Sequence, residues 1–136
     1  MQEMKLSVDT GAVLINIDDS GEVIGQFKFN PNDLDIIKRY EHVVEALEGI
    51  TISEDYDQEE FFKVTDEIKN QMDYLLNYKV SDEIFAKCNP LTLTSKGDFY
   101  VENVIEGIAG LIESVTDERI KKKKAKIQKA TAKYHK

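Results

Sequence analysis

The stretch Gly25-Gln26-Phe27-Lys28-Phe29-Asn30-Pro31-Asn32-Asp33-Leu34 marks a change of hydrophobic period along the chain. Before it, apolar residues recur at every second position, as in a strand with one buried face. After it, they recur every three or four positions, as in a helix. Phe27 and Phe29 share one face of the predicted strand. In Asn30-Pro31 a favourable helix cap precedes a proline suited to the first helical position, and Asp33 adds a negative charge near the positive helix end.

The helix predicted from this point has one broad apolar face. Its members are Leu34, Ile37, Tyr40, Val44 and Leu47, with Ile36, Val43 and Ile50 beside them. Such a stripe is wide enough to pack on a sheet or on other helices.

Upstream of the stretch, the pattern predicts a β-hairpin. Apolar residues alternate over 13–17 and again over 23–29, and the turn residues Asp18-Asp19-Ser20-Gly21 separate the two runs. Lys5–Val8 has the character of a further strand, which would make a three-stranded meander.

Two further long helices are predicted downstream. The first begins at Asp57, which has capping-box spacing to Glu60, and continues with an apolar period through Leu75. The second covers about 98–115 and is the most hydrophobic, so we expect it to be central. Gly107 and Gly110 are unfavourable inside a helix and predict the close approach of another element there. The expected core residues are Leu34, Ile37, Val44, Ile68, Met72, Leu75, Val104, Ile108 and Leu111.

These elements predict an α+β fold in a single domain: an N-terminal antiparallel β-hairpin or three-stranded meander, then a mostly helical domain with a basic C-terminal helix. We expect a β-hairpin region at 1–30, a helical body at 31–116 and the basic helix at 117–136. With 136 residues, of which 41% are hydrophobic, the chain can form a modest core.

Composition also narrows the setting. No run of 18 apolar residues predicts a membrane span, and the N-terminus has no apolar signal-peptide core. The single cysteine, Cys88, fits a reducing compartment. We therefore expect a cytoplasmic protein.

The charge is split unevenly along the chain. Residues 119–136 hold nine of the 18 Lys and Arg and no acidic residue, so this segment carries +9. The other 118 residues hold nine basic and all 26 acidic residues, a net charge of −17. Either the basic segment is a solvated helix, or it docks on an acidic partner that could be another copy of the chain.

The basic segment also has a narrow apolar seam, because Ile120, Ile127 and Tyr134 are spaced seven residues apart. This seam is too thin for a core face and indicates a partner-binding helix. The candidate partner-binding residues are Ile120, Lys121, Lys122, Lys123, Lys124, Ile127 and Tyr134.

No group of residues predicts chemistry. His42, His135 and Cys88 lack neighbours at metal-ligand or catalytic spacing, and no glycine-rich loop could hold a phosphate. We expect no catalytic residue, no metal and no cofactor, and an interaction protein rather than an enzyme. The lysines lack the interleaved aromatic residues of a nucleic-acid interface, so neither nucleic acid nor a membrane is an expected partner.

Three groups of residues carry a resemblance to a known family: Phe27–Asp33, Asp82–Phe85 and Phe99–Ile112. In this order the chain resembles the tail assembly chaperones of phages and prophages of Gram-positive bacteria. The resemblance implies a small, acidic homo-oligomer that binds the tape-measure protein, or another tail protein, in the host cytoplasm during tail morphogenesis. Alternatives are a minor structural subunit of the virion, in the tail or connector, and a DNA-mimic inhibitor.

Overall fold

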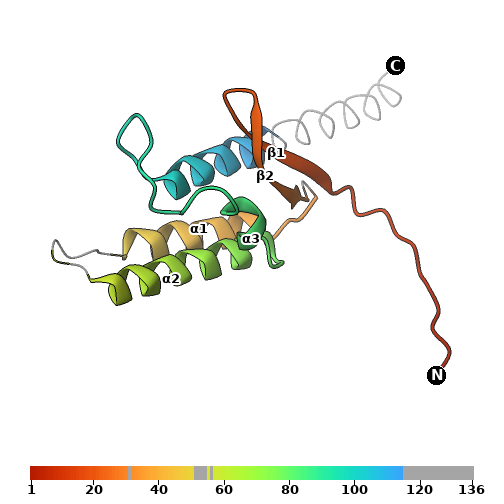
Figure 1. Ribbon diagram of the computed structural model, residues 1–136. Coiled ribbons are helices and arrows are strands. Elements are labelled where there is room, and N and C mark those ends of the chain that lie inside the picture. Colours follow the sequence, from red (N-terminus) through yellow and green to blue (C-terminus); the bar gives the residue numbers. More distant parts are fainter. Residues whose placement is uncertain (31, 51–54, 56, 115–136) are drawn as a thin grey trace, which may run out of the picture.

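The structure is a computed structural model that describes residues 1–30, 32–50, 55 and 57–114. Its elements are β1 (Val13–Asp19), β2 (Glu22–Phe29), α1 (Ile36–Glu48), α2 (Gln58–Leu76), α3 (Ser81–Ile84) and a helix over 100–114, where the described residues end. Figure 1 shows the hairpin followed by an antiparallel α1/α2 pair, with helix 100–114 alongside. The α+β prediction is confirmed, with two strands in the hairpin.

The hairpin follows from its turn and its alternation. β1 and β2 pair from Val13 opposite Phe29 to Asp19 opposite Glu22, with an irregularity after Ile17. The intervening Ser20 and Gly21 both have positive φ, 53° and 93°, as the favoured two-residue hairpin turn requires.

The N-terminal strand predicted at Lys5–Val8 does not form. Residues 1–10 are exposed and lie in no strand, and Figure 1 shows this N-terminal arm (residues 1–10) running away from the body. No strand of the described chain pairs with residues 1–10, so the alternating pattern there does not become part of a sheet.

The two edges of the hairpin differ. The Tyr78 hydroxyl accepts a hydrogen bond from the Lys28 amide at 2.6 Å, on the outer side of β2. On one face of β2, a Cβ atom at Gly25 would lie only 2.8 Å from the Glu83 carbonyl oxygen, so α3 packs against that face of the strand. The outer edge of β1 has no hydrogen-bond partner among the described residues.

The first helix begins later than predicted. The Asn30 side chain accepts from the Asn32 amide at 2.9 Å and forms a local turn, and the helix starts only at Ile36. Leu34 therefore lies outside the helix and is 81% exposed, and Ile37 is 46% exposed, so placing both in the core was wrong.

The second helix begins as predicted, with the Asp57 side chain accepting from the Glu60 amide at 2.8 Å. It ends at Leu76, followed by Asn77 in the left-handed conformation at φ 60°. That conformation is a common way to end a helix.

The core joins all of these elements. It includes Phe27 and Phe29 from β2, for which the alternation predicts only a shared strand face. The other buried apolar residues are Ile36, Val43, Ile68, Met72, Leu75, Leu76, Val80, Ile84, Tyr100, Val101, Val104, Ile105 and Ile108. Val44 and Leu111, predicted as core, are half-buried at its margin.

The glycines of helix 100–114 do not behave as predicted. A Cβ atom added at Gly107 or Gly110 would meet nothing within 4 Å, so no element approaches them in the described chain. Among all the residues that the structure describes, no helix combines the length and the apolar character needed to cross a bilayer.

Candidate interaction surface

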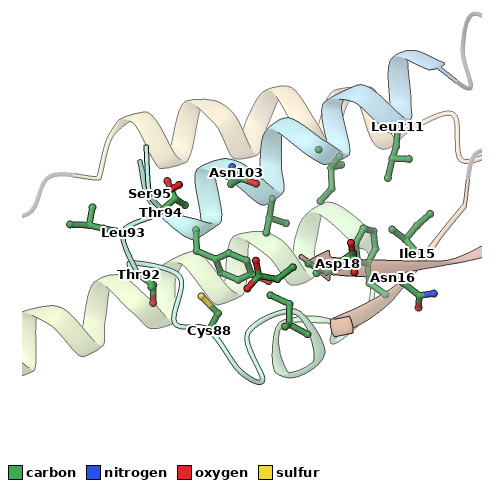
Figure 2. A pocket seen from close by; sticks show the side chains of 18 residues that line it. Ile15, Asn16, Asp18, Cys88, Thr92, Leu93, Thr94, Ser95, Asn103 and Leu111 are labelled. Carbon is green, nitrogen blue, oxygen red and sulfur yellow. The ribbon is translucent and has the colours of Figure 1, made fainter. Parts of the chain in front are cut away.

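Helix 100–114 has an open groove on each side. The first, the hairpin groove, lies between this helix, the hairpin and the loop at 92–95 and encloses about 580 Å³. Figure 2 shows Ile15, Asn16 and Asp18 of β1 on one side and Asn103 and Leu111 of the helix on the other. Its aliphatic and phenylalanine lining residues are Ile15, Ile17, Ile24, Phe27, Leu93, Val104, Ile108 and Leu111.

Tyr100 is a buried polar side chain that lines the hairpin groove. The Tyr100 hydroxyl donates to the Ile84 carbonyl at 3.0 Å. Burial, with smaller effects of Cys88 and Asp19, raises the pKa of Tyr100 to about 12. The phenol is therefore neutral at physiological pH and is held by the backbone, which suits a structural role.

The second groove, the α1 groove, lies on the opposite side of the helix and encloses about 690 Å³. The C-terminal half of α1 forms its other wall. Its apolar lining residues are Tyr40, Val44, Leu47, Ile50, Ile68, Leu91, Phe99, Val101 and Ile105.

Acidic residues border the α1 groove. Glu48 of α1 and Glu102 and Glu106 of helix 100–114 all line it and are exposed. Glu102 and Glu106 are four residues apart on one helix face, where two like charges destabilise the helix by a few tenths of a kcal/mol. A cationic group above the groove would relieve that repulsion.

The outer edge of β1 is the third feature of this surface. A strand edge with free N–H and C=O groups is a template for pairing with another chain. Val13 and Leu14, at its start, are 44% and 58% exposed.

The predicted partner-binding residues, from Ile120 to Tyr134, lie outside the described residues. The grooves were not predicted, because several of their lining residues, among them Val44, Val104 and Ile108, were assigned to the core from their helical period. One sequence feature does point to the α1 groove. The apolar face of the first predicted helix, which ends in Leu47 and Ile50, is broader than one neighbouring helix covers.

In the described part of the chain no three His, Cys, Asp or Glu side chains are grouped to hold a metal ion. His42 packs its ring on Tyr74, with the centroids 5.0 Å apart. Within the described ranges the geometry thus offers apolar grooves and a strand edge without a hydrogen-bond partner. Comparison of the chain with protein-family models, with curated proteins and with solved structures finds no match.

Proposed function

We propose that this protein is an assembly factor that holds an amphipathic helix of a partner protein in its α1 groove. The observation that carries the proposal is the combination of an apolar groove with an acidic border. Recognition of a helix in a groove uses apolar side chains at i, i+3, i+4 and i+7, and flanking charges add selectivity. The preferred ligand is a helix with one apolar face and basic residues beside it.

The sequence resemblance gives this activity a biological setting. We propose a tail assembly chaperone that binds the tape-measure protein and sister subunits in the cytoplasm of an infected or lysogenic bacterium. A long tail protein made before its tube forms must have its apolar helix faces covered, and the α1 groove has the chemistry to cover one.

A direct test is to co-express the full chain with a phage tape-measure protein and to measure complex formation by size-exclusion chromatography. The double variant Glu102→Lys, Glu106→Lys reverses the charge at the border of the groove. It should lower the affinity for the partner by about tenfold or more, which is the contribution of one close charge pair. Glu113→Lys is the matched control, because Glu113 is exposed on the same helix but lines neither groove. Equal binding by both variants would contradict the proposal.

The second candidate, a minor structural subunit of the virion, is supported by the free β1 edge, because structural subunits often join by strand addition. Immunoblotting separates the two functions. A chaperone is present in lysates and absent from purified virions, whereas a structural subunit remains in the virion.

A further inference from the structure

The N-terminal arm and the β1 edge have complementary properties. In the arm, Met4, Leu6 and Val8 alternate with the polar residues Lys5, Ser7 and Asp9. This is the pattern of a strand with one buried face. Yet the three apolar side chains are 93%, 88% and 74% exposed.

The outer edge of β1 matches the arm in length and in hydrogen-bonding capacity. β1 is seven residues long, and its outer edge has no hydrogen-bond partner in the described chain. Ile15 and Ile17 of β1 line the hairpin groove, so a strand added beside β1 would direct every second side chain toward the same groove. The five residues from Met4 to Val8 are long enough to cover most of β1.

The arm is directed away from its own β1. The Gly11 amide donates to the Asp9 side chain at 2.9 Å, and the Ala12 amide donates to the Thr10 hydroxyl at 3.3 Å. The Thr10 carbonyl also accepts from the Asn32 side chain at 3.4 Å. These bonds hold the arm's base in the outward course shown in Figure 1, rather than in a turn back along β1.

We infer that the arm of one copy adds as a strand to the β1 edge of a second copy, with Met4, Leu6 and Val8 in that copy's hairpin groove. The occupant is a second copy because the chain carries both halves of the contact and its arm leads away from its own edge. β2 is the poorer acceptor, since the Tyr78 hydroxyl already accepts from the Lys28 amide on its outer edge. This inference does not depend on which partner the α1 groove binds.

The chain offers matched variants on both sides of the contact. Leu6→Asp puts a charge on the arm's inward face, and Ser7→Asp puts the same charge on its outward face. Gly107→Gln fills the hairpin groove without a clash, because Gly107 lines it and has open space above its Cα. Gly110→Gln is its control, since Gly110 also has open space but does not line the groove.

The experiment is sedimentation velocity of each full chain over a range of concentrations. The unchanged chain, Ser7→Asp and Gly110→Gln should associate alike. Leu6→Asp and Gly107→Gln should weaken association by roughly tenfold or more, the value of one buried leucine side chain. Circular dichroism should show that all variants keep the same helix content.

Mixing the two weakened variants gives the decisive result. Leu6→Asp retains an open groove and Gly107→Gln retains an intact arm, so the mixture should form a heterodimer at concentrations where each variant alone is monomeric. A monomeric unchanged chain at all concentrations would overturn the inference, and so would a mixture that stays monomeric. If the arm instead folds onto its own β1, Leu6→Asp will lower the unfolding midpoint without any change in sedimentation.

Discussion

Arg39 connects the beginning of α1 to the end of α2 through two acceptors. Its Nε donates to the Leu75 carbonyl at 2.9 Å, and its terminal nitrogen pairs with the Asp33 carboxylate. Leu75 lies in the last turn of α2, where carbonyl groups have no partner within the helix. The Arg39 side chain is 13% exposed, so both bonds are shielded from water.

Arg39→Met should lower the free energy of unfolding by about 2–3 kcal/mol, because it leaves a carbonyl and a partly buried carboxylate without their donor. Urea denaturation at pH 7 measures the change. Lys38→Met, at an exposed neighbouring position, should stay within about 0.5 kcal/mol of the unchanged chain. Equal losses for the two variants would mean that Arg39 has no special role.

The same pair predicts a pH dependence. The hydrogen bond from Arg39 lowers the pKa of Asp33 in the folded chain, although burial opposes this effect. The ionised carboxylate therefore stabilises the fold at pH values above the unfolded pKa, about 3.9. That contribution is lost as the pH falls through the lowered pKa. Asp33→Asn should be less stable than the unchanged chain at pH 7, and the gap should shrink in urea titrations below about pH 4.

At the scale of elements, the packing of α3 on β2 depends on a missing side chain. Gly25 allows the Glu83 carbonyl to approach the strand, and it faces Ile17 next to the irregularity in the ladder. Because the obstacle there is backbone rather than a flexible side chain, any Cβ atom must displace α3 or bend β2.

Two alanine substitutions should therefore have opposite signs. Gly25→Ala should cost about 1–3 kcal/mol through overpacking. Gly107→Ala, in a helix and with open space around it, should add up to about 1 kcal/mol through helix propensity. Thermal unfolding followed by circular dichroism compares the two, and a shared sign would refute the assigned environments.

The sequence predicted those elements whose caps, turns and hydrophobic period all lie within their own residues. The α2 helix has its cap, its period and its end within its own sequence, and the hairpin has its turn and alternation. The start of α1 could not be predicted in this way, because Asn30 is as suitable for a turn as for a helix cap. The start of α3 could not be predicted locally either, because its capping side chain comes from another helix. The Asp73 carboxylate, on α2, accepts from the Val80 and Ser81 amides at 2.9 and 2.8 Å.

The candidate surface was harder to predict for a physical reason. A helical period says which side of a helix is apolar, but not whether a neighbour covers it. Leu47, Leu91 and Ile105 come from distant parts of the chain and share the α1 groove only in the folded molecule. The arm's exposure likewise depends on the bonds at Thr10 that direct it outward.

At the scale of the whole molecule, a net charge of +9 on residues 119–136 stands against a net charge of −17 on the other 118 residues. This separation predicts salt-sensitive association through residues 119–136. Charges in solvent are screened beyond about 8 Å at physiological ionic strength. A chain ending at Asp117 should self-associate less than the full chain at low salt, and the difference should vanish at high salt. Sedimentation at both salt concentrations measures this, and salt-independent behaviour of both chains would refute it.

Strand addition should respond differently to salt, since backbone hydrogen bonds and apolar burial change little with screening. A component of association that survives high salt but is lost in Leu6→Asp would belong to the arm. The two modes of contact can thus be separated in one set of measurements.

Cys88 lines the hairpin groove and is the only thiol in the chain (Figure 2). Its half-buried position makes alkylation a measure of how open the groove is, without any engineered label. Iodoacetamide should label the Leu6→Asp chain faster than the unchanged chain at concentrations where the latter is associated. Dilution should bring the two rates together, so that a single reaction rate reports the occupancy of the groove in cell extracts as well as in purified protein.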